Sequence, residues 1–456
     1  MNFPAINPAT EKVEKTYTGH SLAQCRAALQ KSVIAQKYWQ ETSLAERAGL
    51  MKNAAGVLVK RKQEFSGLMT MEMGKPITQS RAEIEKCALN CNYFAENAEK
   101  FLAPEQVPTE SKKSYVRFDA IGTILAIMPW NFPFWQVFRF AAPAIMAGNS
   151  AVLKHASNVP GCSLAIQSVF EEAGLPKGVF QSLLVDSETA SKLIEMPEIA
   201  AVTITGSVAA GAMVAGLAGK NIKKTVLELG GSDAFIVLDD VEIKTCSTQA
   251  VNGRTLNSGQ SCIAAKRFIV SKKIEKRFTE EFVEKMRSLR VGDPMEKDTQ
   301  VGPLAKKELV DNLESQLKRS VKMGAKILTG GKRTSVEGKG FFFEPTVLGS
   351  VSEKMPVFSE ETFGPLAGVM PAEDDEDAVR IANATEFGLG ASVWSSDLDR
   401  AERLVPKIKA GAVSINKIVR SDPRLPFGGT KKSGYGRELG IFGIREFVNI
   451  KAVVVQ

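Results

Sequence analysis

Residues 200–211 have the sequence AAVTITGSVAAG, and this stretch decides the fold class. The apolar run at 200–205 predicts a buried strand, and residues 208–217 predict a helix. Gly206 and Ser207 join the two, and Gly211 lies in the first turn of the helix. This junction leaves backbone N–H groups free at the positive end of a helix, where a diphosphate can bind. Because many such junctions use glycine for geometry alone, further motifs have to support that interpretation.

Short apolar runs alternate with helices on both sides of this junction. We expect further buried strands at 121–128, 151–154, 179–185, 225–229 and 234–238, with helices at 160–173 and 187–193. This alternation predicts right-handed βαβ units and a parallel sheet with both faces covered. After Gly230-Gly231 the pattern restarts, which predicts a second α/β domain with helices near 243–256, 272–288, 306–323 and 373–384 and strands at 267–270, 391–394 and 412–416.

The first hundred residues predict helices at 22–39, 44–71 and 78–101. The third helix carries one apolar stripe, and Cys87 and Cys91 belong to it, so we interpret both as core residues. Two isolated strands at 114–118 and 447–455 lack neighbours along the chain. We expect them to form a flap that pairs with another subunit, because unpaired strand edges promote association. A glycine-rich link is expected at 329–340.

The composition excludes several classes of protein. The 456 residues have a formal net charge of +8 and only two histidines, His20 and His155. Zinc ribbons, HExxH proteases and facial-triad iron sites need histidine or clustered cysteine, so we expect no metal. A Ser-His-Asp hydrolase is disfavoured for the same reason. Basic residues are scattered among acidic ones, which argues against a nucleic-acid partner.

The cysteines and the apolar segments of the sequence are typical of a cytoplasmic protein. None of the six cysteines forms a CxxC pair, which indicates reduced thiols and a cytoplasmic protein. The first residues lack the pattern of a signal peptide. The longest apolar stretch, 121–148, contains three prolines, so we expect no membrane span. Walker A and GxGxxG fingerprints are both missing, which excludes phosphoryl transfer through a P-loop.

Two further segments carry chemical groups. Glu228 ends a predicted strand and is followed by Gly230-Gly231 at a sharp turn. Cys262 follows a loop of small residues, and a thiol nucleophile needs a base or a positive field to ionise. Each residue alone is compatible with a structural role, Cys262 as a buried small side chain and Glu228 as a capping or salt-bridging group.

The ordered set of motifs is more informative than any single one. It comprises PWNFP at 129–133, Lys154, TGS at 205–207, LELGG at 227–231, GQSC at 259–262, ETFGP at 361–365, PFGG at 426–429 and GYGRE at 434–438. In this order and spacing the whole chain resembles the NAD(P)-dependent aldehyde dehydrogenase superfamily, and most of all its succinate-semialdehyde dehydrogenases. The resemblance implies a Rossmann-type cofactor domain at 1–113 and 129–228, a catalytic α/β domain at 229–423, and an oligomerisation flap and C-terminal segment at 114–128 and 424–456.

The resemblance also implies roles for individual residues. Cys262 attacks the aldehyde carbonyl, Asn131 and the Cys262 backbone N–H hold the oxyanion, and Glu228 activates the water that releases the acid. The residues implied in cofactor binding are Trp130, Lys154, His155, Ser157, Gly206, Ser207, Gly211, Leu229, Glu361 and Phe363.

The cofactor and the substrate are less sharply defined. Some NAD-preferring members carry Glu where this chain has Ser157, and the small side chain admits a 2′-phosphate that His155 could approach, so both NAD and NADP are expected. Arg139 corresponds to an arginine that binds a distal carboxylate, and Ser421 could add a hydroxyl. The alternative interpretation of Arg139 is a structural salt bridge. A second arginine of some relatives is replaced by Leu256, which leaves Arg254 and Arg424 as further possibilities.

The expected function is therefore oxidation of an aldehyde, foremost succinate semialdehyde, to its acid with reduction of NAD(P)⁺ by a homodimer or homotetramer. Alternatives are a dehydrogenase of broad specificity or of glutarate semialdehyde, a CoA-acylating enzyme and a non-catalytic binding protein. Glu228 argues against CoA acylation because a positioned base favours hydrolysis.

Overall fold

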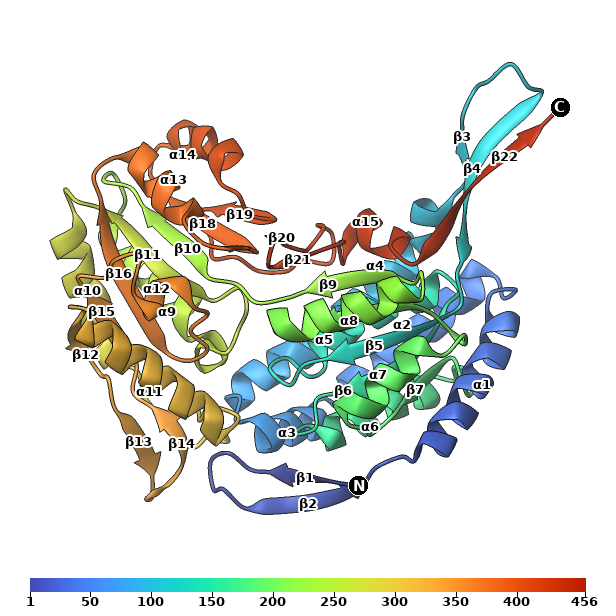
Figure 1. The fold of residues 1–456 in the computed structure, drawn as a ribbon, viewed down its shortest axis with the longest axis horizontal. Helices are drawn as coiled ribbons and strands as arrows, with labels where there is room; N and C mark the ends of the chain where they lie inside the picture. Colours follow the sequence, from blue (N-terminus) through green and yellow to red (C-terminus); the bar gives the residue numbers. More distant parts are fainter.

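A six-stranded sheet forms the centre of the first lobe of the computed structural model, which describes all 456 residues (Figure 1). Its order is β21-β9-β8-β5-β6-β7, with β5 Thr123–Met128, β6 Ser150–His155, β7 Phe180–Ser182, β8 Ile199–Thr205, β9 Lys224–Glu228 and β21 Gly434–Tyr435. Every pairing is parallel except that of β21 with β9. The predicted parallel sheet is therefore confirmed.

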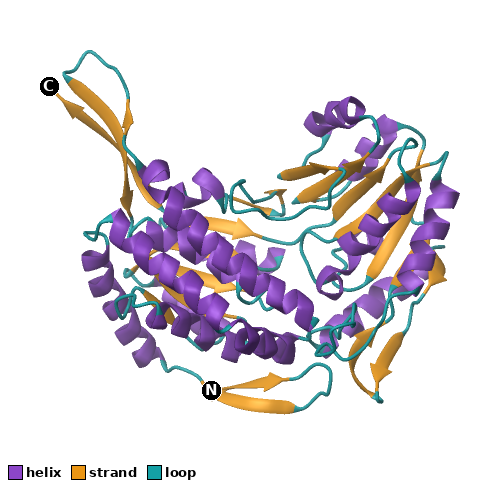
Figure 2. Ribbon diagram, turned by 180° about the vertical axis from the view of Figure 1, so that it is seen from behind, coloured by secondary structure: helices purple, strands orange, loops and turns teal.

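Helices cover both faces of this sheet (Figure 2). They are α1 Leu22–Trp39, α2 Leu44–Lys60, α3 Lys62–Met73, α4 Ile77–Leu102, α5 Trp135–Met146, α6 Pro160–Glu172, α7 Ser187–Glu195 and α8 Val208–Lys220. Alternate side chains of β5 separate the two cores: Leu125 packs with α1, α7 and α8, whereas Ile124 and Ala126 pack with α2 to α6. Strands buried on both faces explain the continuous apolar runs of the sequence.

A seven-stranded sheet forms the second lobe in the order β12-β15-β16-β11-β10-β18-β19. The strands are β10 Asp233–Val237, β11 Ala265–Ser271, β12 Lys326–Thr329, β15 Thr346–Gly349, β16 Leu366–Ala372, β18 Gly390–Trp394 and β19 Ala412–Ile415. Its helices are α9 Ile243–Thr255, α10 Glu275–Arg287, α11 Lys307–Lys322, α12 Pro356–Ser359, α13 Asp375–Asn383 and α14 Leu398–Leu404. All pairings are parallel except β12 with β15, so the predicted second α/β unit is present.

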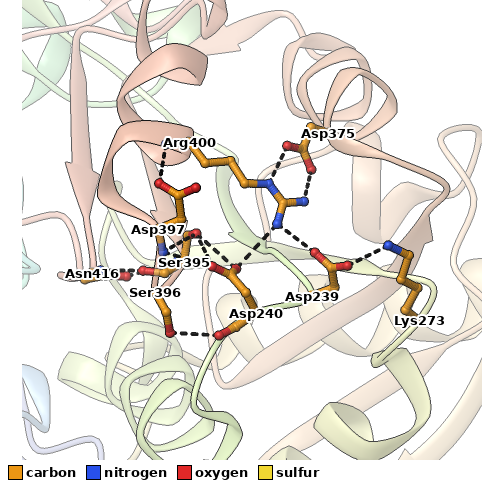
Figure 3. Close-up of polar contacts among 9 residues, drawn as sticks. All are labelled: Asp239, Asp240, Lys273, Asp375, Ser395, Ser396, Asp397, Arg400 and Asn416. Atoms are coloured by element: carbon orange, nitrogen blue, oxygen red, sulfur yellow. Dashed lines mark hydrogen bonds and ion pairs between the residues drawn. The ribbon is translucent and has the colours of Figure 1, made fainter.

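An ion-pair network fixes two helices of this lobe to the end of β10 (Figure 3). The Arg400 guanidinium on α14 lies 2.7 Å from Asp239 and 2.6 Å from Asp375 on α13. Lys273 also pairs with Asp239 at 2.7 Å, and these two cations lower the pKa of that carboxyl to about 2. Three elements that are distant in sequence are thereby held together next to the seven-stranded sheet.

A three-stranded arm projects from the first lobe and carries the C-terminus (Figure 1). It consists of β3 Glu105–Gln106, β4 Lys113–Ala120 and β22 Val448–Val455 in the order β22-β4-β3, and α15 Gly440–Arg445 precedes β22. The two strands that are isolated along the chain pair with each other, antiparallel along their whole length, and so form the expected flap within one chain; its pairing with another subunit stays a prediction. β22 remains an edge strand with exposed Ile450, Val454 and Val455.

Other segments also depart from the sequence predictions. Residues 114–128 are not one flap, because β5 enters the six-stranded sheet and only β4 joins the arm. The helix expected at 44–71 divides into α2 and α3 at Arg61, whose φ of −99° and ψ of 16° are not helical. An unpredicted hairpin, β1 Asn2–Ile6 with β2 Val13–Thr18, opens the chain.

The glycine-rich link at 329–340 is a hairpin in part, since β13 Arg333–Val336 pairs with β14 Lys339–Phe343. The turn of the N-terminal hairpin reaches it, because the Phe341 N–H donates to the Pro8 carbonyl at 3.0 Å. The short strands β17 Phe387–Gly388 and β20 Thr430–Lys431 form a further pair. No helix is long and apolar enough to cross a bilayer.

Candidate active site

A cavity of about 290 Å³ ends at Cys262. Both lobes contribute to its wall: α4 and α5 come from the first, and the loop at 256–263 comes from the second. The side chains that matter below are Lys86, Arg139, Cys262, Arg420 and Ser421. Three of these five are cationic at neutral pH, so the cavity attracts anions.

The loop that presents Cys262 has a strained backbone. Asn257 and Ser258 each have a φ of 54° and Gly259 has a φ of 77°, the left-handed region that non-glycine residues rarely adopt. A Cβ atom on Gly259 would lie 2.2 Å from the Gly364 carbonyl oxygen, so only glycine fits there. Strain of this kind persists only where the surroundings over-determine the conformation, and it is typical of functional loops.

Hydrogen bonds hold this loop in place. Asn257 Nδ2 donates to the Asn131 carbonyl at 2.7 Å, and the Ala305 N–H donates to Gln260 Oε1 at 2.9 Å. Lys266, fully buried, donates to three loop carbonyls including that of Cys262 at 2.8 Å. Sequence analysis did not identify Lys266, although a lysine four residues after a proposed nucleophile was a visible signal.

Cys262 lines the cavity, and Asn131, which does not, is hydrogen-bonded to the loop that carries Cys262. The Cys262 side chain is half-buried, and removal from water raises the pKa of its thiol to about 12 while Arg139 opposes that shift. The Cys262 backbone N–H makes no hydrogen bond within the chain. Asn131 Nδ2 donates one proton to the Gln260 carbonyl at 3.1 Å, so its second amide proton is available.

Glu228 is buried and unpaired. It ends β9, and neither of its carboxylate oxygens has a hydrogen-bond partner within the chain. Burial, aided by the neighbouring Glu438, raises its pKa well above the ordinary value, while Arg139 acts in the opposite direction. It is not among the side chains that line the cavity with Cys262. A buried carboxylate without a partner points to a role with water or ligand.

A second cavity, of about 520 Å³, contains two of the predicted cofactor residues, Lys154 and Ser157. Lys306, at the start of α11 in the other lobe, also lines it and was not predicted. Neither the Lys154 nor the Lys306 ammonium has a carboxylate within ion-pair distance, and the charge of Lys306 adds to burial in lowering the pKa of Lys154. Asp186 and Glu308 also line this cavity but form no ion pair with either lysine, so two unpaired cations lie beside a small hydroxyl, an arrangement that suits a phosphate group.

The strand–helix junction lies at the end of β8. Ser207 caps α8 by accepting from the Ala210 N–H at 3.2 Å, and nothing lies within 3.7 Å of a Cβ placed on Gly206. The first turn of α8 is therefore accessible beside Gly206, as a diphosphate requires. Gly211 has a packing role in the structure, because a Cβ there would lie 2.5 Å from the Leu229 side chain, and its predicted role in cofactor binding stays a prediction. Gly211 and Leu229 allow close packing of α8 against the end of β9.

Two aromatic rings, one from each lobe, pack against each other. The Trp130 and Phe363 rings are 5.7 Å apart and nearly perpendicular. Glu361 accepts from the Gly231 N–H at 3.0 Å, and burial raises the pKa of its carboxyl. Trp130 and Phe363 pack together and Glu361 is two residues before Phe363 in the chain, while the roles of all three in cofactor binding stay predictions.

His155 does not fit the predicted role. It is buried, its Nε2 lies 2.9 Å from the Pro133 carbonyl, and its Nδ1 accepts from the Ala156 N–H at 2.8 Å. Burial lowers the pKa of the imidazole to about 4, so the ring is neutral and both nitrogens are engaged. His155 cannot approach a 2′-phosphate. His20, unassigned from sequence, accepts from the Leu184 N–H at 3.0 Å and supports the fold.

The predicted substrate residues both line the cavity, but the Arg139 charge is already compensated. Its Nε forms an ion pair with buried Glu438, and its guanidinium lies 4.5 Å from the centre of the Phe427 ring. Arg254 bonds only loop carbonyls, including that of Gly259 at 2.7 Å, and exposed Arg424 pairs with Asp422 at 2.7 Å. Neither of these two arginines is available to a substrate carboxylate.

The fold and this arrangement of side chains define a nicotinamide-dependent oxidoreductase. The chain belongs to the aldehyde dehydrogenase family, whose model matches residues 1–453. It is 46% identical over 453 residues to a probable succinate-semialdehyde dehydrogenase (NADP⁺) of Synechocystis sp., covering 99% of both chains. It is also 46% identical to succinate-semialdehyde dehydrogenase (NADP⁺) 1 of Mycobacterium bovis, again over 99% of both. The structure of succinic semialdehyde dehydrogenase from Streptococcus pyogenes in complex with NADP⁺ is similar, with a TM-score of 0.97, 34% identity and 99% of each chain covered.

Proposed function

We propose that the protein oxidises succinate semialdehyde to succinate with NADP⁺ as hydride acceptor. The observation that carries this proposal is the cationic cavity that ends at Cys262, because an aldehyde with a distal carboxylate matches both its reactive end and its charge. The relatives named as NADP⁺-dependent succinate-semialdehyde dehydrogenases support the same substrate and cofactor.

Cys262 acts as the nucleophile in this proposal. Its thiolate adds to the aldehyde carbon, forming a C–S bond and an oxyanion that accepts hydrogen bonds from the Cys262 N–H and Asn131 Nδ2. A bound NADP⁺ would supply the acceptor for the hydride of this carbon. Loss of that hydride would leave the acyl group on Cys262 Sγ as a thioester.

Glu228 acts as the general base. Its raised pKa makes it a stronger base than an ordinary carboxylate, and its unpaired oxygens are able to accept a proton from thiol or water. The attacking water breaks the C–S bond, releases the acid and returns the thiolate, while its proton passes to Glu228. Because Glu228 does not line the cavity with Cys262 in this structure, we expect its side chain to turn toward Cys262 to act.

The chain's own residues fit a dinucleotide. Lys154, Ser157 and Lys306 bind the adenosine end and its 2′-phosphate, and Gly206 with Ser207 bind the diphosphate. Glu361, with Trp130 and Phe363, positions the nicotinamide half. Lys154 and Lys306 support NADP⁺ over NAD⁺ as the cofactor. A 2′-phosphate gives these two ammonium groups an anionic partner, whereas a 2′-hydroxyl does not.

The assembly and the compartment are also proposals. The exposed apolar edge of β22 favours a homodimer or homotetramer built through the arm. All six cysteines are free, which supports the reducing environment of the cytoplasm. The six-stranded and seven-stranded sheets support a division into a cofactor domain and a catalytic domain near residue 229, with β5 now belonging to the cofactor domain.

The test is an activity panel with the full-length protein, read from the absorbance of the reduced nicotinamide. Substrates are succinate semialdehyde, glutarate semialdehyde, butanal and benzaldehyde, each with NADP⁺ and NAD⁺. We expect the highest kcat/KM for succinate semialdehyde with NADP⁺, and no turnover by Cys262→Ala. Equal kcat/KM for succinate semialdehyde and butanal would contradict the substrate assignment, and an active Cys262→Ala variant would contradict the mechanism.

A further inference from the structure

Lys86 is a cation in the Cys262 cavity that has no counter-ion within the chain. It comes from the middle of α4 and is partly buried, and its ammonium lies 4.0 Å from the centre of the Trp135 ring. No carboxylate lies within ion-pair distance of its Nζ. A cation withdrawn from water without an anionic partner is unfavourable, unless a ligand supplies the anion.

The nearest carboxylate on the same helix is already occupied. Glu83, one turn earlier on α4, forms an ion pair with buried Lys75. Its other oxygen accepts from the backbone N–H groups of Phe134 at 3.0 Å and Trp135 at 2.9 Å. Glu83, which also lines the cavity, is therefore compensated by Lys75 and two backbone N–H groups, whereas Lys86 has no ion-pair partner.

Ser421 completes a donor pair with Lys86. Its Oγ accepts from Lys86 Nζ at 2.8 Å and from Trp135 Nε1 at 3.1 Å. A hydroxyl has two acceptor lone pairs and one proton, so these bonds use both lone pairs and leave the O–H free to donate to a further group. An ammonium and a hydroxyl proton, held 2.8 Å apart, match the two oxygens of one carboxylate.

Arg139 is less suited to this task than the sequence suggests. Its Nε forms an ion pair with Glu438, and its Nη2 lies 3.4 Å from Thr205 Oγ1. The positive charge of Arg139 opposes the rise in the pKa values of Cys262 and Glu228, so it acts on the reactive groups. Arg420, exposed at the cavity wall next to Ser421 in the chain, forms no ion pair and strengthens the positive field there.

We propose that Lys86 and the Ser421 hydroxyl together bind the distal carboxylate of the substrate, and that this pair selects aldehydes bearing a terminal carboxylate over uncharged ones. The inference rests on the proposed function, because it assigns the residues that recognise the substrate of that reaction. It replaces Arg139 as the main carboxylate ligand with a residue on α4 that no motif of the sequence marks.

The test compares Lys86→Met with the wild-type enzyme on succinate semialdehyde and on butanal, which has the same number of carbon atoms without the carboxylate. Loss of a hydrogen-bonded ion pair predicts a fall of about 10- to 100-fold in kcat/KM for succinate semialdehyde, chiefly through KM. The kcat/KM for butanal is expected to stay the same or rise. Lys100→Met, an exposed lysine on the same helix outside the cavity, is the matched control and should change neither.

Two outcomes separate this inference from the function on which it rests. A wild-type enzyme with no preference for succinate semialdehyde would overturn the proposed function. A wild-type enzyme with that preference, retained in full by Lys86→Met, would overturn only the role of Lys86. Retained butanal turnover shows that the variant is folded.

The pH dependence decides the question if Lys86→Met does not fold. Burial lowers the pKa of Lys86 to about 8, with Arg139 and Arg420 adding to the shift and Cys87 and Glu83 opposing it. The kcat/KM ratio of succinate semialdehyde to butanal should fall as pH rises through about 8 in the wild type, and stay level in Lys86→Arg. A level ratio in both enzymes would overturn the inference.

Discussion

Arg139 and Glu438 form an ion pair in which both side chains are buried, and both charges act on the unpaired carboxylate of Glu228. The backbone of Glu438 is itself fixed, since it exchanges two 2.7 Å hydrogen bonds with Phe427. The pair therefore couples the C-terminal GYGRE segment to α5, and its two charges set the electrostatic environment of both Glu228 and Cys262.

Removal of Glu438 is expected to destabilise the fold. Glu438→Gln leaves the Arg139 guanidinium buried without a counter-ion, and breaking a buried pair in this way costs about 3–5 kcal/mol of unfolding free energy. Chemical denaturation followed by circular dichroism measures the change. Glu373→Gln removes one partner of an exposed pair with Lys272 and should leave the midpoint almost unaltered. Equal midpoints for the two variants would argue that Glu438 carries no buried charge.

The cofactor preference is expected to depend on Lys306 as well as on Lys154. Lys306→Met removes one of two unpaired cations at the proposed 2′-phosphate site, so kcat/KM with NADP⁺ should fall about 10- to 100-fold, with little change for NAD⁺. Lys307→Met is the matched control, because Lys307 lines the same cavity but already pairs with Asp311 at 2.9 Å. If the NADP⁺ to NAD⁺ ratio of kcat/KM is the same in the two variants, Lys306 does not contact the phosphate.

The motifs predicted most of this architecture, because strand and helix periodicity is local and the sheets follow from alternation. Cys262, Asn131 and Glu228 lie in short segments whose residue types are distinctive, so they too were visible in the sequence. Contacts between distant segments were not. Arg139 forms its ion pair with Glu438, which lies about 300 residues further along the chain, and only the folded structure shows this pairing.

Lysines are the residues that sequence analysis missed. Lys86, Lys266 and Lys306 are single members of an abundant residue type, and nothing local distinguishes a lysine that enters a cavity from one in solvent. The left-handed backbone at Asn257 and Ser258 was equally hidden, because tertiary hydrogen bonds rather than residue preference hold it.

That strained loop gives a stability prediction. Gly259→Ala forces a Cβ to within 2.2 Å of the Gly364 carbonyl at a φ of 77°, so the loop has to move and the fold should lose more than about 1 kcal/mol. Turnover should fall with it, because Cys262 is displaced. Gly216→Ala, on an exposed face of α8 with nothing within 4 Å, should instead stabilise by roughly 0.5–1 kcal/mol. Thermal unfolding of both variants, compared with kcat, checks the contrast; a neutral Gly259→Ala would mean that the loop is not constrained.

Glu228 gives a prediction about pH. Its carboxyl must be ionised to accept a proton, and burial together with Glu438 raises its pKa, so kcat should decline on acidification at a higher pH than an ordinary carboxyl would cause. Glu438→Gln removes a negative neighbour and frees the positive charge of Arg139; both changes lower the pKa of Glu228, so the acidic limb of the kcat profile should move to lower pH. Glu228→Gln should still form the thioester on Cys262 but release acid slowly, and mass spectrometry of the quenched enzyme detects the adduct. An acidic limb that is unchanged in Glu438→Gln, or rapid acid release by Glu228→Gln, would assign the base to another group.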